Sequence, residues 1–145
     1  MTVIVTDSGF GPDDWAHGYI AMDDVPDAST SLLGVDVPSN VDPEILRPFL
    51  DRIDLVRIDF PNFADGRGFT IARHLRLTGF QGRLRAKGHI IADQYAMARR
   101  SGFDEVEIEA DLAVRQPEAQ WAFRTNWRDH DYQTMLRAKK PSLAK

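Results

Sequence analysis

The 145-residue sequence has no cysteine, which excludes disulfides, thiol redox chemistry, a cysteine nucleophile and cysteine-ligated iron–sulfur clusters. Its four histidines lack the spacing of zinc ligands, so no metal site is expected. Apolar runs reach only a few residues, far short of a membrane span, and no secretion signal is visible at the N-terminus. We therefore expect a cytoplasmic protein without a membrane partner and with no evident cofactor.

What the sequence does have is an uneven distribution of charge. The first 65 residues hold thirteen acidic side chains and three arginines, whereas residues 67–100 hold eight basic side chains and one acid, Asp93. The basic segment either neutralises the acidic half of the same fold or binds an anionic molecule or an acidic partner. No nucleic-acid-binding motif accompanies this charge, so nucleic acid is not expected as a partner.

Strand patterns alternate with helix patterns along one domain, 1–145. Residues 1–31 indicate irregular strands and loops, with strands near 2–6 and 19–22, and residues 111–145 indicate a C-terminal helix and tail. In the core, 32–110, strands are predicted at 32–37, 53–60, 83–87 and 105–108, and helices from 42, over 69–78 and over 90–101. This alternation predicts an α/β fold of βα units with a mainly parallel sheet, either flavodoxin-like or a partial (βα) barrel.

The predicted strands alternate between apolar and charged residues, although parallel strands covered on both faces usually form continuous apolar runs. Val56 and Ile58 point one way while Arg57 and Asp59 point the other, and the pattern recurs in later strands. Helices should thus cover one sheet face while the other carries charge. That charged face is predicted to be a binding surface, a solvated face, or a face buried in a homodimer or against a partner protein.

The sequence Asp65-Gly66-Arg67-Gly68 is the strongest local motif, because it follows a predicted strand and precedes a helix. Sites in parallel α/β folds form at the carboxyl ends of strands, and helix N-termini favour anions. Arg67 could hold an oxyanion with its planar guanidinium. In the alternative interpretation the loop is a tight connection, and Arg67 pairs with Asp59 or Asp65.

A second polar group is predicted at neighbouring strand ends, where Asp59 closes one strand and Lys87 the next. His89 and Asp93 follow Lys87 at the start of a helix. His89 has the chemistry of a general acid–base group, or else serves as a polar helix cap. No catalytic residue can be assigned from these positions.

Residues 58–104 carry a specific combination of motifs that resembles the signature of a bacterial family of uncharacterised proteins, and the resemblance is close over about Leu32–Ile108. The motifs are Ile58-Asp59-Phe60-Pro61, the stretch Phe63–Arg73, the stretch Gly79–Ala86, Asp93-Gln94 and Ser101-Gly102-Phe103-Asp104. Members of that family are commonly labelled as oxidoreductases of sulfite reduction. His89 stands where the family usually has aspartate, and Ser101 where cysteine is common.

The resemblance implies an accessory protein of assimilatory sulfate and sulfite reduction. Such a protein would bind an oxyanion or contact a sulfite or nitrite reductase or another sulfur-assimilation protein. The alternative is a small enzyme that acts on an anionic metabolite at the carboxyl ends of the strands, with Arg67, Lys87 and His89 as working groups. Since no redox centre is visible in the sequence, the purified protein is expected to be colourless.

Overall fold

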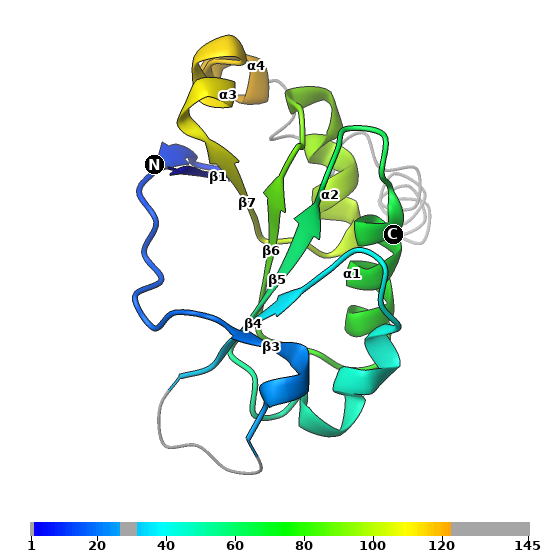
Figure 1. Ribbon diagram of the computed structural model, residues 1–145. Helices are drawn as coiled ribbons and strands as arrows, with labels where there is room; N and C mark the ends of the chain where they lie inside the picture. Colours follow the sequence, from blue (N-terminus) through cyan, green and yellow to red (C-terminus); the bar gives the residue numbers. More distant parts are fainter. Residues whose placement is uncertain (1, 27–31, 123–145) are drawn as a thin grey trace, which may run out of the picture.

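A computed structural model describes residues 2–26 and 32–122 of the chain (Figure 1). At its centre is a seven-stranded sheet with the order β2-β1-β7-β6-β5-β4-β3. The strands are β1 (Thr2–Thr6), β2 (Gly9–Gly11), β3 (Ile20–Ala21), β4 (Gly34–Val37), β5 (Leu55–Phe60), β6 (Arg83–Gly88) and β7 (Glu105–Glu109).

The prediction of an α/β fold with a mainly parallel sheet is confirmed. Strands β3 to β7 are parallel and lie side by side in chain order, and the sheet stays open instead of closing into a barrel. The chain-order arrangement differs from the flavodoxin-like order, in which the strand order reverses within the sheet. The first two strands add an antiparallel edge, since β1 pairs with β7 and with β2.

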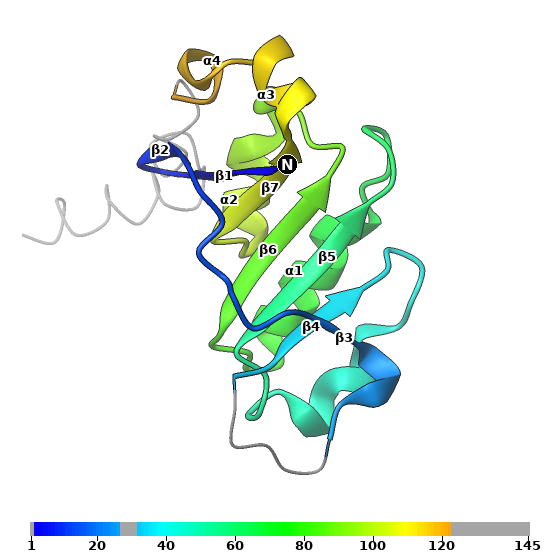
Figure 2. The same cartoon turned by 60° about the vertical axis from the view of Figure 1, so that its left-hand side comes forward.

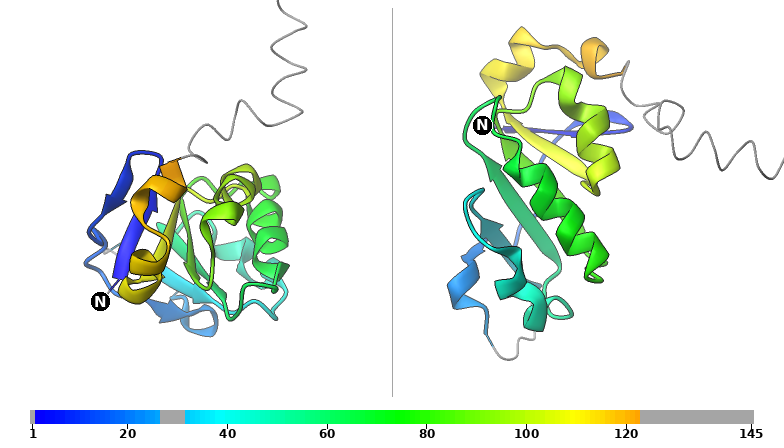
Figure 3. Two further views of the ribbon diagram at one scale, coloured as in Figure 1. Left: turned by 90° about the horizontal axis from the view of Figure 1, so that it is seen from above. Right: turned by 90° about the vertical axis from the view of Figure 1, so that its right-hand side faces the viewer.

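Helices cover one face of the sheet. Figures 1 and 3 show α1 and α2 on that side, where they pack over β5 and β6. Apolar residues of the strands, such as Val56, Ile58 and Leu84, are fully buried beneath them. The helices are η1 (Met22–Asp24), η2 (Pro43–Phe49), α1 (Arg67–Leu77), η3 (Ala92–Gln94), α2 (Tyr95–Ser101), α3 (Ala110–Arg115) and α4 (Glu118–Ala122).

Several helix boundaries follow the predicted signals. The Asp42 carboxylate caps η2 by accepting a hydrogen bond from the Glu44 amide at 3.0 Å. This helix is 3₁₀ rather than α, and Pro48 inside it has no N–H for an α-helical ladder. Gly102 ends α2 with a φ of 115°. Residues 123–145 of the predicted C-terminal helix and tail lie outside the described residues.

The segment 12–19, here called the crossing segment, runs over the other face of the sheet (Figure 2). It connects β2 at one edge to β3 at the opposite edge. Beneath it, the side chain of Arg85 is completely buried although it points away from the helices. The charged face is thus partly buried, but a segment of the same chain supplies the cover that the sequence led us to expect from a second copy or a partner.

Across residues 2–26 and 32–122, no helix is both long enough and apolar enough to cross a membrane.

Candidate functional site

The charged face of the sheet is held together by ion pairs between neighbouring strands. Asp36 of β4 stands opposite Arg57 of β5 in the strand register, and the carboxylate accepts two hydrogen bonds from the guanidinium at 2.6 and 3.0 Å. Arg57 also donates to Glu107 of β7 at 3.2 Å. The predicted alternation of acidic and basic strands therefore results in direct pairing across the sheet.

Arg85 of β6 is the centre of this network. Its Nε donates to Glu105 at 2.5 Å, and its Nη1 donates to Glu107 and to Asp13 of the crossing segment, each at 3.0 Å. Nη2 has no hydrogen-bond partner among the described residues, although Asp14 lies 3.5 Å away. Burial alone would lower the pKa of Arg85, but Glu105 and Asp13 raise the pKa above its usual value. Arg85 is therefore a permanent cation.

The crossing segment adds its own groups to the network. Asp14 accepts a hydrogen bond from Arg83 at 2.8 Å, which lowers the pKa of this carboxyl. The ring of Tyr19 lies 3.5 Å from the guanidinium carbon of Arg57, and its hydroxyl contacts Arg85 at 3.1 Å. The middle of the charged face is consequently an internal network in which the charged groups pair with one another, although Nη2 of Arg85 lacks a hydrogen bond among the described residues.

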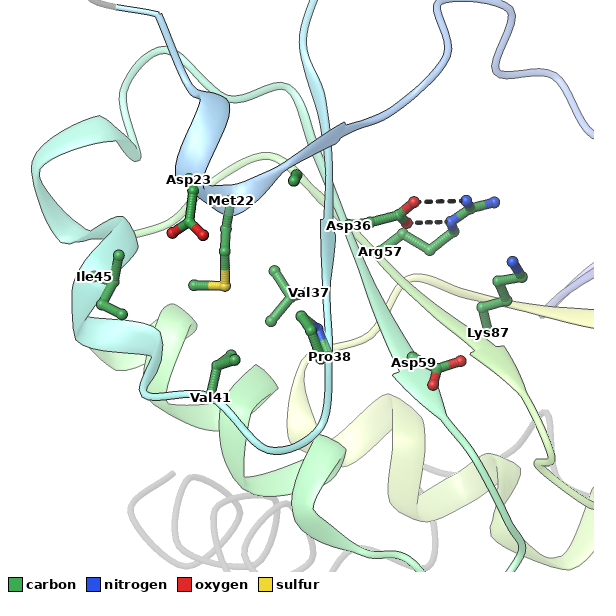
Figure 4. Close-up of a pocket in the computed structure, with 11 residues that line it drawn as sticks. Met22, Asp23, Asp36, Val37, Pro38, Val41, Ile45, Arg57, Asp59 and Lys87 are labelled. Atoms are coloured by element: carbon green, nitrogen blue, oxygen red, sulfur yellow. Dashed lines mark hydrogen bonds and ion pairs between the residues drawn. The ribbon is translucent and has the colours of Figure 1, made fainter.

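An open pocket lies at the carboxyl ends of β4, β5 and β6, beside η1 and η2 (Figure 4). We call it the edge pocket; its volume is about 610 Å³. In Figure 4 its apolar side chains lie on one side of β4, and Asp36, Arg57, Asp59 and Lys87 lie on the other. The apolar side chains are Met22, Val37, Pro38, Val41 and Ile45.

Two charged side chains of the edge pocket differ from those of the network. Asp59 of β5 and Lys87 of β6 stand opposite each other in the register. Within residues 2–26 and 32–122, neither side chain has an ion pair or a hydrogen bond, whereas Asp36 and Arg57 in the same pocket are paired. Asp59 and Lys87 are therefore available to a ligand.

The structure brings together only part of the predicted strand-end group. Asp59 and Lys87 share the edge pocket, but His89 and Asp93 do not line it. His89 is exposed, with Nδ1 3.3 Å from the carbonyl oxygen of Phe60 and its ring edge-to-face with Phe63. The predicted group is thus divided between the pocket and the following segment, where His89 precedes η3 and Asp93 lies within it.

The Asp65–Gly68 loop, whose last two residues begin α1, contains the pairing that the alternative interpretation proposed. Arg67 donates to both carboxylate oxygens of Asp65, at 2.9 and 2.6 Å, and these hydrogen bonds hold the pKa of Asp65 well below its usual range. Ser39 donates to the same carboxylate at 3.1 Å. Gly68 has a packing role, because a Cβ there would lie 2.4 Å from the ring of Phe60. Anion binding by the loop stays a prediction.

Sequence reasoning missed the residues that complete the pocket from other segments. Met22 and Asp23 belong to η1, and Val41 and Ile45 come from the start of η2 and the loop before it. Among the residues of the pocket, the sequence indicated only Asp36, Arg57 and their neighbours, through the alternation of apolar and charged residues along the strands. Among the described residues, no group of three or more histidine and acidic side chains could hold a metal ion.

The sequence profile of a family described as "Bacterial protein of unknown function (DUF934)" matches residues 34–143. The chain belongs to this family. The match begins at β4 and includes β5, β6 and the Asp65–Gly68 loop, whereas the crossing segment precedes it. No curated protein matches the chain. The resemblance to an uncharacterised bacterial family is therefore confirmed, and the family description names no reaction.

Proposed function

We propose that this member of the DUF934 family is an accessory, ligand-binding protein of assimilatory sulfite reduction. The pathway rests on the resemblance over residues 58–104. Ligand binding rests on one observation: among the described residues, Asp59 and Lys87 have no partner in a pocket, on a sheet face whose other charges are largely paired. Pockets at the carboxyl ends of parallel strands are the usual ligand sites of open α/β sheets.

The proposed role includes contact with a sulfite or nitrite reductase or another sulfur-assimilation protein. Most of the basic residues between 67 and 100 are occupied inside the chain, which favours a protein partner over a broad anion-binding surface. Those with acidic partners are Arg67, Arg76, Arg83, Arg85 and Arg99. The crossing segment already covers the charged face, so burial of that face requires no homodimer.

Oxyanion binding at the Asp65–Gly68 loop would require Asp65 to release Arg67. An oxyanion would then take the two guanidinium hydrogen bonds that the carboxylate now accepts. Calorimetry with sulfite tests this. If Arg67 holds the anion, Asp65→Asn should strengthen sulfite binding, and adding Arg67→Lys to that variant should abolish the gain. Equal weak titrations for wild type and both variants would remove the loop from the proposal.

A small enzyme acting on an anionic metabolite is the second candidate. The observation that favours it is the ammonium of Lys87, which has no partner in the part of the chain that the structure describes. Asp59 beside it would serve as the proton acceptor. His89 and Arg67 lie outside the pocket, so only one of the three working groups expected from the sequence reaches it.

Deletion of the gene tests the proposed function. We expect a bacterium lacking it to grow slowly on sulfate or sulfite and normally on sulfide or cysteine. The wild-type gene should restore growth, and Asp59→Asn with Lys87→Gln should not. Arg73→Gln, at an exposed residue of α1 that does not line the pocket, is the matched control. Equal growth of deletion and parent strains on every sulfur source would contradict the proposal.

A further inference from the structure

The charge of the edge pocket limits the chemistry of its ligand. Its acidic side chains are Asp23, Asp36 and Asp59, and its basic ones are Arg57 and Lys87, so the formal sum is −3 + 2 = −1. The Asp36–Arg57 pair is internally neutral. A free dianion such as sulfite would meet a net negative pocket, while a simple cation would meet Lys87. A ligand with one charge of each sign matches better.

Asp59 and Lys87 stand opposite each other on adjacent parallel strands, and such strands lie about 4.8 Å apart. Both residues are on the sheet face away from the helices, in the same pocket. The two side chains therefore start from neighbouring positions, from which both can reach one compact head group that carries an ammonium and a carboxylate close together, as an α-carbon does.

Part of the apolar side of the edge pocket is exposed to solvent. Met22 and Val37 form a buried floor, while Ile45 keeps 51 % of its surface exposed at the wall. An exposed isoleucine beside two other apolar wall residues, Pro38 and Val41, gains from any apolar group that displaces water there. The cavity, about 610 Å³, lies within the range of small-molecule sites.

We propose that the edge pocket binds a zwitterionic α-amino acid with a large apolar side chain. Its carboxylate pairs with Lys87, its ammonium pairs with Asp59, and its side chain lies across the end of β4 against Met22, Val41 and Ile45. This inference names the ligand class of the pocket and so rests on the ligand-binding part of the proposed function.

Calorimetry on the full chain with four probes tests the head group. L-Leucine and L-methionine should bind. 4-Methylpentanoate, which lacks the ammonium, and 3-methylbutylamine, which lacks the carboxylate, should each bind about 10- to 100-fold more weakly, as expected for losing one charge-assisted contact. Equal affinity for leucine and 4-methylpentanoate would overturn the inference in favour of a simple anion site, and no binding of any probe at millimolar concentration would overturn it entirely.

Variants assign each contact. Asp59→Asn and Lys87→Gln should each weaken leucine binding at least about tenfold. Ile45→Ser should reduce the difference in affinity between leucine and alanine. Arg73→Gln should bind as wild type does. Neither Asp59 nor Lys87 is paired within the described residues, so melting temperatures should stay close to wild type. Unchanged leucine affinity in both charge variants would contradict the assignment.

The binding experiment and the growth experiment test different parts of the proposal, and either can give a negative result without the other. A sulfur-source growth defect without amino-acid binding would remove the ligand class and leave the accessory role standing. Amino-acid binding without any growth defect would leave the ligand class standing and remove the place in sulfite reduction.

Discussion

Arg85 and Lys87 are two residues apart on β6 and point to the same face of the sheet, yet their surroundings are opposite. Arg85 is fully buried and contacts Glu105, Glu107 and Asp13. Lys87 is partly exposed and has no acidic partner within the described residues. A single strand thus carries one charge that serves the fold and one that remains available for binding.

The crossing segment explains this difference. Through Asp13, Asp14 and Tyr19 it contacts Arg85, Arg83 and Arg57, all toward the middle of the sheet. The carboxyl ends of β5 and β6, with Asp59 and Lys87, remain at the edge pocket. The covered middle of the charged face is therefore structural, and function is expected at its open edge.

The largest expected effect is a difference in the free energy of unfolding between a substitution at Arg85, in the covered middle of the charged face, and one at Lys87, in the edge pocket. Arg85→Met leaves the buried carboxylates of Glu105 and Glu107 short of a partner, and breaking a buried ion pair from one side costs about 3–5 kcal/mol. Lys87→Met removes no pair and should change the free energy of unfolding by about 0.5 kcal/mol or less. Urea denaturation of both variants measures the difference.

For each of these two variants, the opposite result would contradict the role assigned to the residue. Were Arg85→Met as stable as wild type, the network would not be a structural element, and the charged face would again be open to a binding role. A loss of several kcal/mol in Lys87→Met would instead show that Lys87 supports the fold.

A smaller effect is expected at Tyr19, which joins the crossing segment to the network. Tyr19→Phe loses the hydrogen bond to Arg85 and should destabilise the protein by about 1.5 kcal/mol, a typical value for a hydrogen bond to a charged group. Tyr19→Leu also loses the ring over Arg57, worth about 0.5–2 kcal/mol more. If the two variants unfold at the same urea concentration, the ring contact contributes nothing and only the hydroxyl fastens the segment.

Much of this organisation could be predicted from alternating residues. Val56 and Ile58 against Arg57 and Asp59 correctly assigned one face to the core and the other to charge, because side chains alternate along a strand. The chain order of β4 to β7 came only from the structure, because the strand pattern left a flavodoxin-like sheet and a partial barrel both open. The interpretation of Arg67 remained divided, since a short acidic–basic motif fits both an anion site and the ion pair with Asp65.

The crossing segment and the pocket could not be predicted in the same way. Residues 12–19 have no periodic pattern, and nothing local indicates that Asp13 and Asp14 meet arginines about 70 positions later. Met22 and Ile45 are far from each other in the sequence and line one pocket only in the folded chain. Contacts of this kind depend on tertiary placement, which is why sequence reasoning expected an external cover for the charged face.

The smallest expected effect concerns pH and the attachment of the crossing segment. The pKa of Asp14 is lowered in the folded protein by its hydrogen bond from Arg83, so this pair stabilises the attached segment above the usual carboxyl pKa of 3.8 and is lost as the pH falls through the lower folded value. The Asp14 side chain is 67 % exposed, so the stabilisation is modest and weakened by salt.

The indole N–H of Trp15, which donates to the Gly18 carbonyl at 2.7 Å, is the reporter for this change. Its ¹H–¹⁵N resonance should stay constant from pH 7 to about 5 and move below about 4, where free carboxyls protonate. In Asp14→Asn the shift should already be partly present at pH 7, and the remaining pH response should be smaller. The amide of Val56, a fully buried residue of β5, serves as the control for global unfolding. Identical pH profiles in wild type and Asp14→Asn would mean that Asp14 does not hold the crossing segment, and that Asp13 and Tyr19 attach it alone.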